Sequence, residues 1–185
     1  MIPIVAAYFV PRGRRPRASR LPAIQRALSR CQRFFAREAS LALIWRLHPS
    51  PIFGSTRADQ YADALQLERE VRAHCGCESE TVGIFFEGHL PRPALATMGD
   101  SGPQFFVIAE PHLGFLEDDE HDDIVAHEIG HTLGLQDRHE GLSIMRQGRR
   151  VASLGQWGLY PWTRAHLARE DRKALRRVWA SDDWE

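Results

Sequence analysis

The residues best suited to chemistry lie at positions 126–137, where the sequence is AHEIGHTLGLQD. His127 and His131 are four residues apart, so on a helix their side chains lie on one face, one turn apart. Two imidazoles in this arrangement can bind one zinc ion at about 2.0–2.1 Å each. Glu128 lies beside them, and its usual role in the pattern H-E-x-x-H is that of a general base. The stretch therefore predicts a helix that holds one Zn²⁺ ion per chain.

The residues after the second histidine predict the third metal ligand. Glycine adopts positive φ easily, so Gly134 can end the helix and let the chain turn back toward the metal. This turn would bring Asp137 to the zinc, and three protein ligands leave the fourth position for water. His139, two residues further on, is the rival third ligand. The alternative to a metal site is a pair of histidines hydrogen-bonded in the core.

The stretch resembles the pattern H-E-x-x-H-x-x-G-x-x-H/D of the metzincin clan of zinc peptidases. That spacing favours Asp137 over His139, and the snapalysin-like peptidases are similar in having aspartate there. The layout of the whole chain looks like an archaemetzincin. The second zinc site of that family is not supported, because no cysteine follows Cys77. The resemblance also identifies residues 142–145 as the Met-turn, with Met145 beneath the metal.

The resemblance implies a zinc metallopeptidase that cleaves within peptide chains. Peptide bonds would be hydrolysed by a zinc-bound water, with Glu128 as the general base. In metzincins an antiparallel strand at the edge of the sheet pairs with the substrate backbone, and residues 105–109 are predicted to be that strand. The predicted substrate-binding residues are Phe105, Phe106, Val107, Ile108 and Ala109.

Other functions compete with this prediction. A zinc-binding regulatory or peptide-binding module with little or no turnover is the main alternative. Glu128 counts against it, because a structural zinc has four protein ligands and needs no base. A site with a distant glutamate ligand is disfavoured by Gly134, which stops the helix. The sequence GDSG at residues 99–102 is similar to a serine-protease segment, but the histidines upstream lack the required context.

Hydrophobic periodicity indicates the elements that must position the site. Strands are expected at residues 2–9, 41–47, 81–87 and 104–110, and helices at 21–39, 56–74 and 163–179. The predicted fold class is α+β with an α/β-like N-terminal part. It is a zincin-like mixed sheet with an antiparallel edge strand, an active-site helix, the Met-turn and a C-terminal helix. We expect a single domain over residues 1–185, with an N-terminal subdomain at about 1–134 and a C-terminal subdomain at about 135–185.

Composition narrows the choice of partners. Of 185 residues 43% are hydrophobic, and 24 basic residues balance 24 acidic ones, so a polyanion is not the expected ligand. No apolar run approaches the length of a membrane span. We therefore expect a monomer that meets a peptide or protein substrate, with no nucleic acid and no membrane. A cytoplasmic location is expected if Met1 is the native start, and a secreted one if a leader was removed.

The cysteine count predicts no disulfide framework. Three cysteines are an odd number, and Cys31, Cys75 and Cys77 lack the partner pairs of a zinc knuckle. We expect buried free thiols.

Overall fold

The computed structural model describes residues 1–61, 63–78, 80–97, 104–118, 122–137, 143–145 and 166–179. The strands are β1 (Ile2–Arg12), β2 (Leu43–Leu47), β3 (Ile52–Arg57), β4 (Thr81–His89), β5 (Ala94–Ala96) and β6 (Phe105–Glu110). The helices are α1 (Arg20–Ala39), α2 (Ala64–Cys75), α3 (His112–Phe115), α4 (Asp122–Thr132) and α5 (Arg169–Trp179), with short 3₁₀ turns η1 (Ala58–Gln60) and η2 (Leu116–Asp118). The predicted α+β class, with its mixed sheet, is confirmed.

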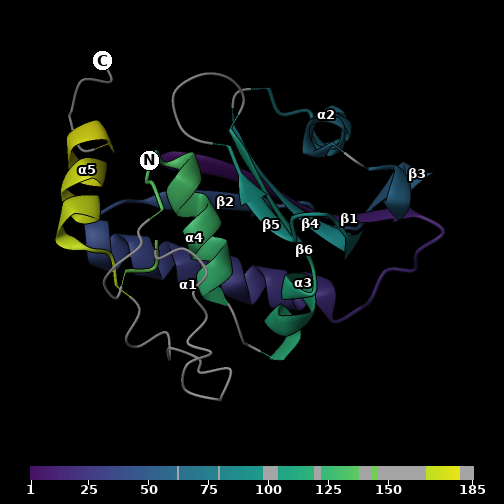
Figure 1. The fold of residues 1–185 in the computed structure, drawn as a ribbon, viewed down its shortest axis with the longest axis horizontal. Helices are drawn as coiled ribbons and strands as arrows, with labels where there is room; N and C mark the ends of the chain where they lie inside the picture. The colour runs from purple at the N-terminus through teal and green to yellow at the C-terminus, as the bar shows by residue number, and fades with distance from the viewer. Residues whose placement is uncertain are drawn as a thin grey trace.

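The sheet is mostly parallel and is covered on both faces. Its strand order is β2-β1-β4-β6-β5, and β3 pairs with the far end of β1. All of these pairs are parallel except β5 with β6, which is antiparallel. Figure 1 shows α1 and α4 on one side of the sheet and α2 on the other. Strands buried on both faces have nearly continuous apolar sequences, and β1 and β4 fit that rule.

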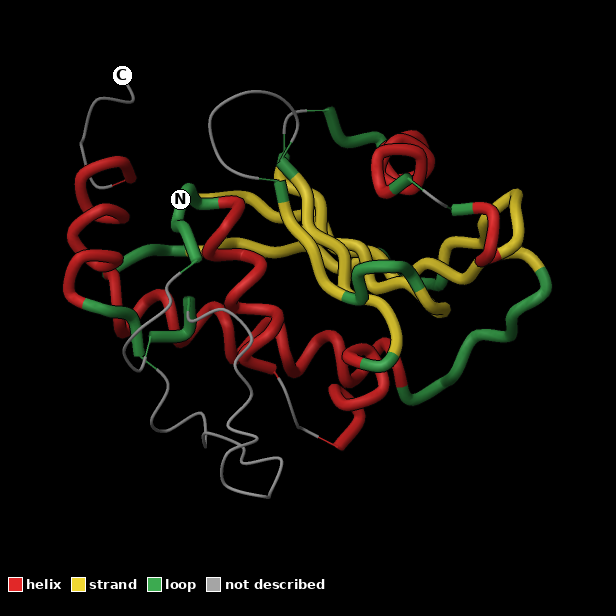
Figure 2. The backbone as a smooth tube through the Cα atoms, viewed as in Figure 1, coloured by secondary structure: helices red, strands yellow, loops and turns green. Residues whose placement is uncertain are grey.

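Two apolar cores follow from this arrangement. Alternate residues of β1 point to opposite faces, so Tyr8 joins the core under α1 and α4, and Phe9 joins the core under α2. Helix α1 buries residues at helical spacing, among them Ile24, Leu28 and Phe35. The tube drawing shows α1 as the long helix that runs beneath the strands (Figure 2).

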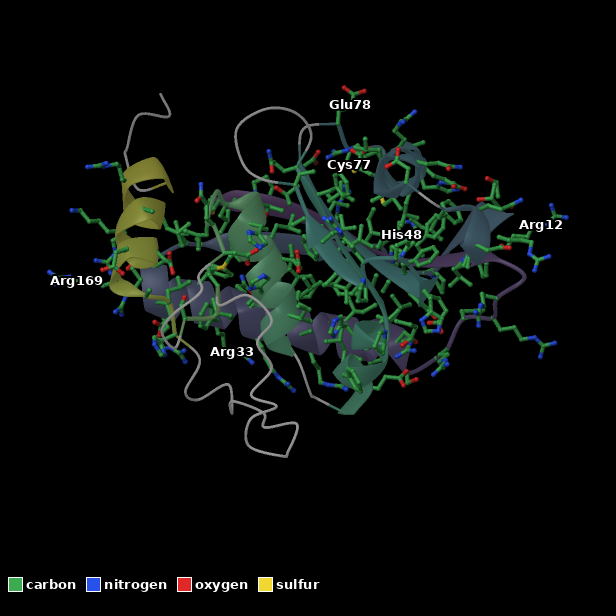
Figure 3. All side chains as sticks on the ribbon, in the orientation of Figure 1. Arg12, Arg33, His48, Cys77, Glu78 and Arg169 are labelled. Carbon is green, nitrogen blue, oxygen red and sulfur yellow. The ribbon has the colours of Figure 1, made fainter. Side chains whose placement is uncertain are left out.

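A buried arginine attaches α1 to the sheet. The Arg20 side chain is fully buried, and its Nε donates to Oε2 of Glu87 in β4 at 3.1 Å. The Tyr8 hydroxyl donates to the same oxygen at 2.6 Å, and Arg20 also pairs with Glu110 of β6. A buried charge is tolerated only when it is paired and hydrogen-bonded, and this one is. The network fixes the position of α1, against which α4 packs. By contrast, Arg33 of α1 and Arg169 of α5 lie exposed at the surface (Figure 3).

The position predicted for the edge strand is wrong. The strand over residues 105–109 is interior, because β6 pairs in parallel with β4 on one side and in antiparallel with β5 on the other. On this side of the sheet the edge strand within the described residues is β5, which lies between the strands predicted at 81–87 and 104–110, where none was expected. The flanking prolines, Pro91 and Pro93, and the shortness of β5 hide this strand from periodicity. The uninterrupted apolar sequence of β6 is typical of an interior strand.

Other bounds differ from the prediction. Residues 52–57 form β3, where no strand was expected, and the helix predicted over residues 56–74 begins later. Helix α2 begins at Ala64 because the Asp63 carboxylate accepts the Leu65 N–H at 2.9 Å and caps it. Helix α5 begins at Arg169, later than the expected start at residue 163, and residues 163–165 lie outside the described part.

Several further expectations meet the structure. The three cysteines are free thiols, and Cys31 and Cys77 are buried as expected, whereas Cys75 is only half-buried. Cys77 lies beside α2 (Figure 3). Within the described residues, no helix is both long and apolar enough to cross a membrane. The division into two subdomains stays a prediction, because most of the second one lies outside the described residues.

Candidate metal centre

Helix α4 carries the two predicted metal-binding histidines. Its Val125 and Ile129 are buried in the core that α1 shares, and Leu133 is buried just beyond its end. These apolar residues face the core, so the helix cannot rotate without exposing them. The opposite face of the same turns presents His127 and His131.

The end of α4 is set by glycine. Gly134 has φ of +88°, the left-handed conformation that glycine adopts at no steric cost. The Gly134 N–H donates to the His131 carbonyl at 2.9 Å, and the Leu135 N–H donates to the Gly130 carbonyl at 3.0 Å. These two hydrogen bonds form a Schellman motif, which ends the helix as its sequence predicted. The chain then reverses direction and brings residue 137 back beside the histidines.

Three side-chain atoms converge at this point. The Nε2 atoms of His127 and His131 lie 3.1 Å apart, and each lies 3.4 Å from Oδ1 of Asp137. Ligands arranged tetrahedrally at about 2.0–2.1 Å from one ion are separated by about 3.3–3.4 Å. The structure therefore brings His127, His131 and Asp137 together at the spacing of a zinc ligand set. The rival residue, His139, lies outside the described residues.

Backbone carbonyls fix the tautomer of both imidazoles. Nδ1 of His127 lies 2.8 Å from the Ile144 carbonyl oxygen, and Nδ1 of His131 lies 2.8 Å from that of Leu135. A carbonyl oxygen only accepts, so each Nδ1 must carry the proton. Each neutral ring then directs the lone pair of its Nε2 toward the other ring and toward Asp137. This is the second-shell arrangement by which proteins orient metal-binding histidines.

The three converging atoms of the site are all electron-pair donors, and no positive charge among the described residues balances them. Oδ1 of Asp137 is buried and has no hydrogen-bond partner among the described residues. Two imidazole lone pairs and this carboxylate oxygen face one another across less than 3.5 Å. Buried polar atoms are nearly always satisfied, so an orphaned acceptor at this position fits a bound cation. The residues present therefore suit Zn²⁺, which takes nitrogen and carboxylate ligands.

Glu128 lies in the same site and is almost completely buried, with 4% of its surface exposed. Its Oε2 atom has no hydrogen-bond partner among the described residues. Burial, and then the negative charge of Asp137, raise the pKa of Glu128 to about 8. A carboxylate in this environment binds a proton far more tightly than one in water, which suits a general base.

Residues 143–145 lie directly against the helix. Met145 is buried, and a Cβ atom at Gly130 would collide with its sulfur. Glycine inside a helix lowers stability by about 1 kcal/mol relative to alanine. Gly130 is nevertheless required here, because a larger residue would collide with Met145. Sequence reasoning named Met145 but missed Gly130, although a glycine in the middle of a helical pattern was a signal. The carbonyls of Leu135 and Ile144, which orient the two histidines, were also missed. Every residue has a backbone carbonyl, so the sequence carries no signal for this role.

The residues predicted to bind substrate occupy a different kind of position. Phe105, Phe106, Val107, Ile108 and Ala109 are at most 2% exposed. Their backbone groups bond to strands on both sides, so they are not available to an added chain. Among the described residues, the edge strand that packs against α4 is β5.

The fold is similar to those of two solved structures, an archaemetzincin and a metalloproteinase. An archaemetzincin from Methanopyrus kandleri superposes with a TM-score of 0.55 at 13% identity, over 97% of this chain and 96% of that one. Metalloproteinase-II from Bacteroides fragilis superposes with a TM-score of 0.57 at 11% identity, over 95% of this chain and 53% of that one. This chain thus spans about half the length of the second protein. The sequence matches no protein-family model and no curated protein.

Proposed function

We propose that this protein is a zinc-dependent endopeptidase, with a peptide or protein as its substrate. The observation that carries the proposal is the convergence of His127, His131 and Asp137 at tetrahedral ligand spacing, beside the buried Glu128. A purely structural zinc site would need a fourth protein ligand and would not require a buried carboxylate next to the metal. Two solved structures that share the fold are an archaemetzincin and a metalloproteinase, which supports the same activity.

Each side chain has a distinct part in the proposed reaction. His127, His131 and Asp137 hold the metal, and the Ile144 and Leu135 carbonyls keep the two rings in the metal-binding tautomer. Zinc, when bound, supplies a Lewis acid that polarises the peptide carbonyl and makes water more acidic. Glu128 takes the proton of the attacking water and returns it to the leaving amine. Its buried position favours this proton transfer, because the desolvated carboxylate is a strong base.

We propose the free edge of β5 as the place where the substrate backbone pairs. The Ala109 N–H donates to the Pro93 carbonyl, and the Thr97 N–H donates to the Phe105 carbonyl. In an antiparallel pair the hydrogen-bonded positions alternate, so Leu95 also bonds inward to Val107. The N–H and C=O groups of Ala94 and Ala96 consequently point away from β6. An extended peptide could add to them as another strand, next to α4, the helix that carries His127 and His131.

The test is cleavage of a mixed peptide library by the zinc-loaded protein, beside Glu128→Gln loaded in the same way. Glutamine keeps the shape of the side chain and removes the base, so the variant should still bind one zinc per chain. We expect cleavage by the wild type and a loss of about 10²–10⁴-fold in the variant, the usual contribution of a general base. If the wild type binds one zinc and cleaves nothing, the proposal is wrong and the zinc-binding module becomes the better interpretation. Equal cleavage by both proteins would remove Glu128 from its role.

A further inference from the structure

We propose that Ser143 and Asp171 are positioning residues for the metal ligand His127, acting through the backbone of residues 143–145. The inference rests on the proposed zinc site and adds two residues to it that lie outside the helix of the ligands. Asp171 is 28 positions from Ser143 in sequence, and their side chains meet in the interior.

The Ser143 hydroxyl is the centre of the connection. Its Oγ donates to Oδ2 of Asp171 at 3.0 Å, and it accepts from the N–H of Met145 at 3.2 Å and of Ala168 at 3.3 Å. One donor and two acceptor positions are all that a hydroxyl has, so these bonds fix its orientation completely. Ser143 is 7% exposed and Asp171 is 4% exposed, so water does not replace these partners readily.

The connection continues to the metal ligand. The Ile144 N–H donates to the His166 carbonyl at 2.9 Å, and the Ile144 carbonyl accepts from Nδ1 of His127 at 2.8 Å. Ile144 is therefore held by hydrogen bonds at its own N–H and, through Ser143, at both neighbouring residues. A carbonyl held in this way determines both the tautomer and the angle of the His127 ring.

Asp171 is itself held in place. It is the third residue of α5, where the helix dipole favours a carboxylate. The segment before α5 is tied to α1, because the Leu167 N–H donates to Oε2 of Glu38 at 3.3 Å. Arg172 pairs with the same oxygen at 3.7 Å. The position of Asp171 is thus fixed by the main core, and through Ser143 it transmits that rigidity to the site.

The test compares zinc affinity and the tautomer of His127 in the wild type and four variants. Zinc affinity is measured by competition with a chromophoric chelator, and the tautomer from ¹⁵N chemical shifts of the metal-free protein. Ser143→Ala should weaken zinc binding by about 10-fold, the lower end of the range for residues that support metal ligands. Its His127 should become a mixture of tautomers, because the Ile144 carbonyl is no longer held. Asp171→Ala is the second variant and should act in the same direction.

Two controls separate positioning from folding. In Asp171→Asn the amide oxygen can still accept from Ser143, so zinc affinity should stay close to that of the wild type. Leu175→Ala removes a buried side chain from α5 without touching the chain of hydrogen bonds, so it should lower the melting temperature alone. The inference is overturned if Ser143→Ala and Asp171→Ala keep the wild-type zinc affinity and tautomer. It is also overturned if Leu175→Ala shifts both as strongly. Absence of zinc binding in the wild type would remove the proposed function, while the tautomer in metal-free protein would still test the positioning.

Discussion

The Nε2 atoms of His127 and His131 lie 3.1 Å apart, although two neutral rings cannot share a hydrogen bond there while both Nδ1 atoms donate to backbone carbonyls. Two lone pairs at this distance repel, and the Asp137 carboxylate adds negative charge beside them. Only a proton or a metal ion relieves the repulsion. The metal-free fold is therefore less stable than its packing alone would make it.

Zinc should consequently raise the thermal stability of the protein. A ligand that binds only the folded state at 100 times its dissociation constant stabilises by about 2.7 kcal/mol. For a chain of this size that corresponds to an increase of about 5–10 °C in melting temperature. Thermal unfolding with zinc and with EDTA measures the difference. His131→Gln should abolish the increase, whereas His74→Gln, on the exposed face of α2, should retain it.

The stability of the metal-free protein should fall between about pH 4.5 and pH 8. The pKa of Glu128 is raised from 4.5 to about 8 in the folded state, chiefly by burial. Between these values the folded protein keeps a proton that the unfolded chain has lost, so rising pH favours unfolding. The slope from this one group is at most about 1.4 kcal/mol per pH unit. Urea unfolding in EDTA at several pH values, with Glu128→Gln alongside, isolates the contribution. An unchanged slope in that variant would contradict the assignment.

Gly134→Ala should weaken zinc binding, whereas Gly13→Ala, which introduces similar backbone strain elsewhere, should not. Gly134 and Gly13 both have positive φ, +88° and +83°, and a Cβ atom would meet nothing within 4 Å at either. Alanine should therefore destabilise the fold at both positions by about 1–2 kcal/mol through backbone conformation alone. Only at Gly134 does the turn determine where Asp137 lies, so zinc affinity should fall there and not in Gly13→Ala. Equal zinc affinities in the two variants would show that the turn at Gly134 does not determine the position of the ligand Asp137.

Proline substitutions in β5 should distinguish the N–H groups that pair with substrate from those that pair with β6. Ala96→Pro removes an N–H that points away from β6, so the fold should persist. The lost hydrogen bond to substrate, about 0.5–1.5 kcal/mol, should lower kcat/KM by up to about 10-fold. Leu95→Pro removes an N–H that bonds to β6 and should lower the melting temperature instead. If Ala96→Pro cleaves peptides as well as the wild type, the substrate does not pair with this edge.

Local sequence determined most of the metal centre. The spacing of His127 and His131 and the glycine at 134 act over a single helical turn and its end, so their geometry follows from helix periodicity and from positive φ. Continuous apolar segments likewise indicated most strands, because strands buried on two faces are apolar throughout. Apolar residues at helical spacing indicated the long helix α1.

Only the tertiary structure decided which strand lies at the edge and what supports the ligands. The apolar sequence of β6 is typical of an interior strand, but strand neighbours are chosen by pairing between distant segments, so that sequence could not identify β5 as the strand that covers its outer side. The contact of Ser143 with Asp171 joins residues 28 positions apart, and the carbonyls of Leu135 and Ile144 act through backbone atoms that every residue shares. Side-chain identity does not encode such contacts, since they exist only once the core has fixed α1, α4 and α5 relative to one another.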